Sequence, residues 1–210
     1  MEKDRIHEDL ASIRNMMERS SRFISLSGLS GIMAGIYALA GAAFAYFKIY
    51  NMHAVRAELS YKLADPTGAK EHVAELIAVA IIVLVLSIGT GVLLTIRKAK
   101  KAGQKIMGKS SKALIFNMLL PLLTGGAVIL IFISRGYIGI VVPSCLIFYG
   151  LALANASHYT FTDVKYLGIM EIILGILAAL YVGYGLIFWS IGFGLLHIIY
   201  GSVMYLKYDK

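Results

Sequence analysis

Residues 76–96 read LIAVAIIVLVLSIGTGVLLTI, an apolar run without a single charged side chain. The hydrocarbon core of a bilayer is about 30 Å thick, and an α-helix needs about 20 apolar residues to cross it. This run therefore has the length and composition of one membrane-spanning helix. Strands of a membrane β-barrel would alternate between apolar and polar residues, and these residues do not alternate.

Runs of the same kind recur along the rest of the chain. Hydrophobic residues make up 59% of the 210 residues and charged residues only 15%, whereas soluble domains carry about 25% charged residues. We therefore predict an all-α integral membrane protein, a bundle of six transmembrane helices within residues 23–206. The predicted spans are residues 23–47, 74–96, 113–134, 137–156, 166–183 and 186–206.

Lysine and arginine are distributed unevenly between the segments that connect these spans. If the N-terminus lies inside the cell, fifteen of the 20 Lys and Arg residues fall in cytoplasmic segments and five in outer ones. Membrane proteins retain cationic segments on the cytoplasmic side. We therefore predict an N-in/C-in topology in a bacterial cytoplasmic (inner) membrane, with residues 207–210 as a cytoplasmic tail.

Residues 1–22 precede the first span and carry apolar side chains at helical spacing among charged ones: Ile6, Leu10, Ile13 and Met17. This pattern predicts an amphipathic helix that lies on the inner membrane surface. Pairing of this helix with a second copy is the alternative interpretation.

The connection between the second and third spans is strongly basic, with seven cations and no anion in residues 97–112. Each such cation is attracted to an anionic inner leaflet by about 1 kcal/mol, so we predict contact with anionic lipid headgroups. Residues 103–110 also match the phosphate-loop pattern GxxxxGK[ST], but the required strand before it is missing. We therefore expect neither nucleotide nor nucleic acid as a partner. The predicted headgroup contacts are Arg97, Lys98, Lys100, Lys101, Lys105, Lys109 and Lys112.

Small residues recur at four-residue spacing within several spans, among them Gly31 and Gly35 in the first span and Gly175 and Ala179 in the fifth. Such spacing lets membrane helices approach closely. The sequence therefore predicts close helix packing at these positions. A homodimer formed through Gly31 and Gly35 is the alternative.

Two ionisable residues, Glu171 and His197, lie inside predicted spans. Ionisable groups are costly in a membrane and normally face protein or water. At 1.5 Å per helical residue, Glu171 lies roughly 8 Å and His197 roughly 13 Å from the inner ends of their spans. Helical spacing places Ser190, Gly194, His197 and Gly201 on one face. A short turn joins the two spans, so we expect the two side chains to be coupled.

Two amides, Asn117 and Asn155, lie towards the same side of the membrane and complete the candidate polar site. Three interpretations remain open: a structural hydrogen-bond cluster, a ligand or proton site, and a metal site. Zinc prefers three or four ligands, which one His and one carboxylate do not supply. We therefore expect no metal and no cofactor.

The sequence contains no Ser/His arrangement, paired Asp residues or HExxH motif that would indicate an intramembrane enzyme. We therefore expect a noncatalytic membrane module that binds a ligand, lipid or partner, as a sensor or accessory subunit. The alternative is a small transporter or channel with a polar path at Glu171 and His197.

Overall fold

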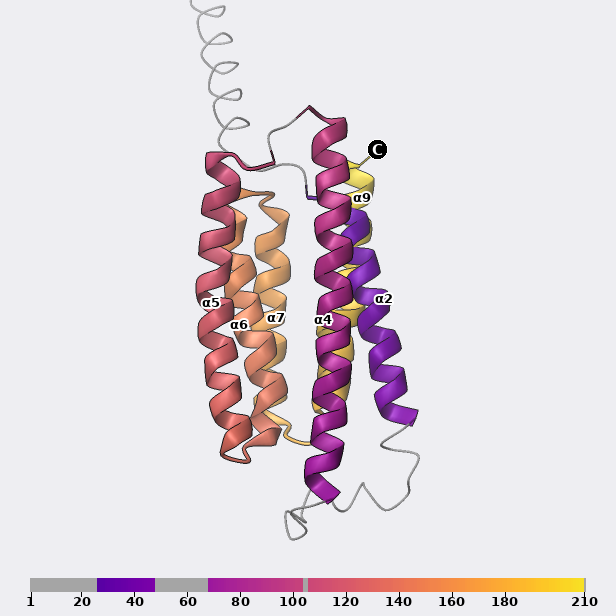
Figure 1. Cartoon of the computed structure of the whole chain (residues 1–210), viewed down its shortest axis with the longest axis vertical. Helices are drawn as coiled ribbons and strands as arrows, with labels where there is room; N and C mark the ends of the chain where they lie inside the picture. Colours follow the sequence, from indigo (N-terminus) through magenta and orange to yellow (C-terminus); the bar gives the residue numbers. More distant parts are fainter. Residues whose placement is uncertain (1–25, 48–67, 104–105, 210) are drawn as a thin grey trace, which may run out of the picture.

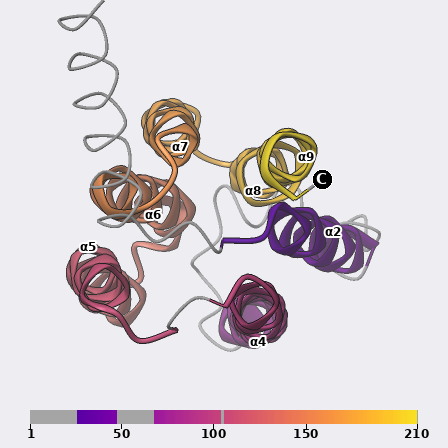
Figure 2. The same cartoon turned by 90° about the horizontal axis from the view of Figure 1, so that it is seen from above.

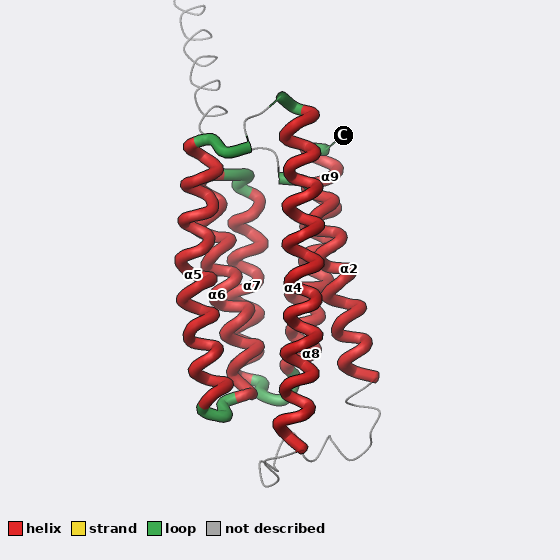
Figure 3. The backbone as a smooth tube through the Cα atoms, viewed as in Figure 1, coloured by secondary structure: helices red, strands yellow, loops and turns green. Residues whose placement is uncertain are grey.

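The computed structural model describes residues 26–47, 68–103 and 106–209. The amphipathic helix predicted for residues 1–22 lies outside the described residues, and so does Lys105. All regular elements in the described part of the chain are helices (Figure 3). The long ones are α2 (Gly28–Ala45), α4 (Gly68–Lys101), α5 (Lys109–Ser134), α6 (Val141–Ala156), α7 (Asp163–Leu180) and α9 (His197–Tyr208). The short ones are η2 (Ile138–Ile140), η3 (Ser157–Tyr159), α8 (Gly185–Trp189) and the π-helix η4 (Ser190–Leu196).

Five helical stretches in the described residues are long and apolar enough to cross a membrane. The prediction of an all-helical, multi-pass membrane protein is therefore confirmed at this level. Helix α7 is not among the five, because its 18 residues include Asp163, Lys165 and Glu171. The count of six crossings and their direction stay predictions. The five stretches are Gly28–Ala45, Ala74–Lys101, Lys109–Ser134, Ile138–Tyr159 and Gly185–Tyr208.

The long helices run up and down along one common direction (Figure 1). Helix α6 packs on α5 and α7, and α2 packs on α4 and α9. Seen from above, the helices follow one another around an incomplete ring in the order α5, α6, α7, α9, α2 and α4 (Figure 2). We call the end that holds Lys98, Lys109 and the C-terminus the basic end. Helices α2, α5 and α7 begin there, whereas α4, α6 and α9 end there.

Glycines allow the closest helix contacts. A Cβ atom added to Gly168 of α7 would lie 2.7 Å from the carbonyl oxygen of Gly150 in α6. On the same pair of helices, a Cβ atom at Gly175 would lie 2.7 Å from Ile147. Both distances are too short for real atoms, so α6 and α7 can approach this closely only without these side chains. Ala179, one turn beyond Gly175, is half-buried.

Gly31 and Gly35 provide a second close contact, between α2 and the last helices. A Cβ atom at Gly31 would lie 3.1 Å from the Cα atom of Gly201, and one at Gly35 would lie 2.6 Å from the Gly194 oxygen. This face of α2 is therefore covered within the chain. A homodimer formed through Gly31 and Gly35 would have to displace α9.

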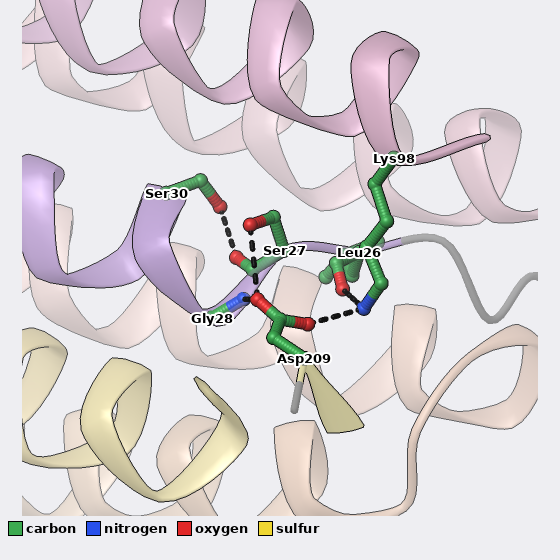
Figure 4. A network of polar contacts seen from close by, with 6 residues as sticks. All are labelled: Leu26, Ser27, Gly28, Ser30, Lys98 and Asp209. Carbon is green, nitrogen blue, oxygen red and sulfur yellow. Dashed lines mark hydrogen bonds and ion pairs between the residues drawn. The ribbon is translucent and has the colours of Figure 1, made fainter. Parts of the chain in front are cut away.

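Three helix ends are joined at the basic end by Asp209 (Figure 4). The backbone N–H of Gly28 and the Ser27 hydroxyl donate to Asp209 Oδ2 over 2.9 Å and 3.1 Å. Free N–H groups at a helix N-terminus favour a negative charge there. Lys98 of α4 forms an ion pair with Asp209 and donates to the Leu26 oxygen over 2.7 Å. Asp209 therefore connects the start of α2 to the ends of α4 and α9.

Lys98 is consequently engaged inside the protein rather than free to meet a lipid headgroup. The other described cations of this connection, which were predicted to contact headgroups, are exposed. They are Arg97, Lys100, Lys101, Lys109 and Lys112.

Asp163 forms a second polar cluster at the basic end. It accepts hydrogen bonds from Tyr208 over 2.6 Å and from Lys207 over 3.0 Å. Partial burial alone would raise the pKa of Asp163, but the two hydrogen bonds and the charge of Lys207 outweigh it and lower that pKa below its ordinary value. Asp163 therefore stays ionised and joins the start of α7 to the end of α9.

We predict that Gly168→Ala destabilises the bundle by about 2 kcal/mol, because the new methyl group would overlap backbone atoms that cannot move aside. The matched control is Gly126→Ala in α5, where no atom lies within 4 Å of the added Cβ atom. Alanine is the better helix former, so the control should be neutral or stabilising. Unfolding of the purified protein in detergent measures both. Equal effects of the two substitutions would contradict the packing described for α6 and α7.

Candidate functional site

Glu171 is an ionisable residue in the interior of the bundle. It lies on α7 with 0% of its surface exposed. Its carboxyl group packs against Gly192 of the π-helix, where an added Cβ atom would lie 2.6 Å from Glu171 Oε2 and 2.5 Å from Leu146. Because Gly192 has no side chain, the carboxyl group of Glu171 can occupy this space.

The π-helix also places His197, which follows its last residue. The Nδ1 atom of His197 lies 2.9 Å from the carbonyl oxygen of Gly192. A carbonyl oxygen only accepts, so Nδ1 carries a hydrogen and donates it. The Nε2 atom lies 2.7 Å from the Tyr149 hydroxyl of α6. In the neutral imidazole, Nε2 accepts the hydrogen of Tyr149. Short π-helices occur frequently at functional sites.

Glu171 and His197 face each other directly. Glu171 Oε1 lies 3.5 Å from His197 Nδ1, too far for a good hydrogen bond, and Nδ1 already donates to Gly192. Within the described residues, neither carboxyl oxygen of Glu171 has a hydrogen-bond partner. An ionised carboxylate buried without a donor is very costly. The arrangement therefore fits a neutral carboxylic acid beside a neutral imidazole.

The surroundings of this pair are aromatic and closely packed. The ring of Tyr149 stacks on His197 with 5.4 Å between ring centres, and Phe193 lies 5.2 Å from Tyr149. Even one methyl group would not fit between Gly192 and Glu171. This side of the pair therefore has no room for an organic ligand. In the described part of the chain, no three His, Cys, Asp or Glu residues gather as they would around a metal ion.

The structure brings Glu171 and His197 together but places neither predicted asparagine beside them. Asn117 donates to the carbonyl oxygen of Ala113 over 2.9 Å within its own helix. Asn155 is exposed near the end of α6. Asn117 belongs to α5, which packs on α6 rather than on α7. Asn117 and Glu171 therefore lie apart, although both were predicted in the inner half of the membrane.

Sequence reasoning missed Tyr149 and Gly192, the two residues that hold His197 and Glu171. Tyr149 could have been found by its depth, since it lies in the middle of a predicted span, far from the membrane boundaries where tyrosines gather. Gly192 carried no such signal. Its position depends on the π-helix, which shifts the helical register before His197.

The fold and this buried pair define the class of the chain: an α-helical, multi-pass membrane protein with a polar site in its interior. Neither a family model, nor a curated protein, nor a solved structure matches it.

We predict that the stability effects of Glu171→Gln and His197→Gln are not additive, with a coupling of about 0.5–3 kcal/mol, as for residues in contact. Unfolding of the two single variants and the double variant in detergent measures this coupling. The matched control pairs Glu171→Gln with Asn117→Ala, which should add within about 0.5 kcal/mol. Additive effects for both pairs would mean that Glu171 and His197 do not interact.

Proposed function

We propose that this chain is a noncatalytic membrane module, a sensor or accessory subunit, whose ligand at Glu171 and His197 is a proton. The observation that carries this proposal is the unpaired carboxyl group of Glu171, fully buried 3.5 Å from an imidazole nitrogen. A proton fits a site whose packing at Gly192 leaves no room for an organic ligand. Both groups exchange protons in water at moderate pH.

A proton lost from Glu171 would have a structural consequence. The carboxylate left behind needs a donor, and the Nδ1–H group of His197 faces it with Nδ1 3.5 Å from Oε1. That nitrogen now donates to Gly192, so it would have to turn away from the π-helix. Because η4 also packs on α2, deprotonation would change the contact between these two elements. This coupling is what a proton-responsive module requires.

We further propose that the module crosses the membrane six times with both termini in the cytoplasm of a bacterial cell. Helix α7, the fifth long helix of the described residues in chain order, would be the span that raises the count from five to six. Its Asp163 and Lys165 lie in its first turn at the basic end, and Glu171 faces the interior. The bilayer would therefore meet only apolar side chains along most of α7. The exposed cations of the connection between α4 and α5 would contact anionic lipid headgroups of the inner leaflet.

A small proton transporter or channel is the alternative function. It is favoured by a shallow groove of about 250 Å³ between α2 and α8 at the opposite end of the bundle. The groove reaches Ser190, where the π-helix begins. If water entered by this route, Glu171 would be open to the side of the membrane opposite the basic end, one of the two accesses that a transporter requires.

Single-cysteine labelling tests the proposed topology. In a Cys145→Ala background, Tyr184→Cys lies in the exposed turn between α7 and α8, and Ala102→Cys lies at the exposed end of α4. We predict that a membrane-impermeant thiol reagent labels Tyr184→Cys on intact cells. Ala102→Cys should label only after permeabilisation. The reverse pattern would contradict the N-in/C-in topology.

Infrared difference spectroscopy of the protein in liposomes tests the proton site. We predict a buried carboxylic acid band that changes reversibly with pH and is absent in Glu171→Gln. The matched control is Glu75→Gln in α4, which should keep the band. A band that persists in Glu171→Gln, or no band in the unchanged protein, would refute the proposal.

The same liposomes, loaded with a pH-sensitive dye, distinguish between the two proposed functions, a noncatalytic module and a proton transporter. A noncatalytic module should leave the internal pH constant after an external acid pulse. Acidification that disappears in Glu171→Gln would establish the transporter instead.

A further inference from the structure

The helices of the bundle form two groups. Helices α5 and α7 both pack on α6, and we call these three helices the α6 half. Helices α4, α9 and η4 pack on α2, and α8 packs on η4; we call this group the α2 half. At the two ends of the incomplete ring, α4 and α5 share no comparable contact in the described residues (Figure 2). The halves therefore meet chiefly where α6 and α7 face α8, η4 and α9.

The buried polar pair lies on the boundary between the two halves. Glu171 and Tyr149 belong to the α6 half, whereas Gly192 and His197 belong to the α2 half. The Tyr149 hydroxyl lies 2.7 Å from His197 Nε2, and Glu171 Oε1 lies 3.5 Å from His197 Nδ1. An added Cβ atom at Gly192 would lie 2.6 Å from Glu171 Oε2 and 2.5 Å from Leu146 of α6. At Gly192 the halves therefore touch without room for a water molecule.

The two ends of this boundary are fixed on α7. At the basic end, Asp163 of α7 accepts hydrogen bonds from Lys207 and Tyr208 of α9. The pKa of Asp163 is lowered, so this contact persists while Glu171 gains or loses a proton. At the opposite end, the turn at residues 181–184 joins α7 directly to α8. Its Gly183 has φ of 102°, a conformation that favours glycine. The seam between α7 and α9 can therefore act as a hinge axis.

From this arrangement we infer that the proton on Glu171 controls the angle between the two halves, which close when Glu171 is protonated and part when it is ionised. The inference rests on the proposed proton site and adds the movement that the proton controls. It makes the buried pair a conformational switch between the α6 half and the α2 half.

A buried carboxylate cannot be satisfied while the halves stay closed. The Nδ1–H group of His197 can turn to Glu171 Oε1, but one N–H group cannot serve both oxygens. Oε2 packs against Gly192 and has no donor within the described residues. Water is the remaining donor. A water molecule occupies about 30 Å³ and so needs a gap of about 3 Å. Ionisation of Glu171 would therefore push α6 and α7 away from η4.

The separation should be largest between α4 and α5, which lie farthest from the hinge axis in the ring (Figure 2). At the basic end, Leu26 precedes α2 and packs against Leu114 of α5. This contact holds the halves together there. We therefore expect the widest opening towards the opposite end, where α4 begins and α5 ends.

Few titratable groups face Glu171, so its own charge can set the contact. They are His197 of α9 and Tyr149 of α6, which contact each other. Helices α8 and η4 carry no titratable side chain. On α7 itself and on η3, the titratable side chains lie towards the basic end: Asp163, Lys165, Tyr166, His158 and Tyr159.

Distance measurement by electron paramagnetic resonance tests this inference. Spin labels are attached to Ile82→Cys in α4 and Leu130→Cys in α5, both exposed, in the full chain with Cys145→Ala in liposomes. We expect the distance between the labels to increase by about 3 Å or more as the pH rises and the Glu171 carboxylic acid band disappears. With Glu171→Gln, which carries no charge, the distance should stay at its low-pH value.

The matched control pair keeps the label at Leu130→Cys and moves the other to Leu180→Cys, at the exposed end of α7. Both labels then lie in the α6 half, so their distance should not depend on pH. Equal widening of both pairs would overturn the division into two halves. Widening that persists with Glu171→Gln would overturn the control by Glu171.

Failure of this inference differs from failure of the proposed function. A carboxylic acid band that changes with pH while the distance between α4 and α5 stays constant would overturn the movement and leave the proton site. The absence of any pH-dependent band in the unchanged protein would refute the proton site and the movement together.

Discussion

The close contact between the Glu171 carboxyl group and Gly192 is the constraint on which the rest of the site depends. It holds an acidic group at 0% exposure where no donor within the described residues reaches it. Water or a hydrogen-bond donor would normally compensate a buried carboxyl group. Here His197 faces it at 3.5 Å but donates to Gly192 instead. One hydrogen on Nδ1 therefore has two competing acceptors, and the charge of Glu171 decides between them.

Glycine packing maintains this arrangement on both sides. Gly168 and Gly175 bring α7 against α6, which places Glu171 near Tyr149. Gly31 and Gly35 bring α2 against the π-helix and α9. At the basic end, Asp209 joins α2, α4 and α9 through charged hydrogen bonds (Figure 4). Since packing rather than the hydrophobic effect holds membrane helices together, these contacts stabilise the polar pair.

The sequence predicted the helical class because long uncharged runs allow no other structure in a membrane. It also placed Glu171 near His197, since a short turn joins their helices. It did not predict the face that each residue occupies on the last helix. Regular helical spacing grouped Gly194 with His197, but Gly194 packs on Leu39 of α2 whereas His197 faces Tyr149. The π-helix shifts the helical register between Gly194 and His197, and no residue pattern in the sequence predicted the π-helix. Asn117 was predicted at a depth similar to that of Glu171, but its helix α5 packs on α6 rather than on α7.

Solid-state NMR of the labelled protein in lipid bilayers can determine the protonation state of the buried pair, by observing the Glu171 carboxyl carbon and the two ring nitrogens of His197. We predict a neutral carboxylic acid beside an imidazole that is protonated on Nδ1 alone. On raising the pH, the carboxyl signal should change to that of a carboxylate, and the Nδ1–H signal should shift with it. A carboxylate paired with an imidazolium over the whole pH range would contradict the proposed proton site, because a permanent ion pair has no proton to exchange.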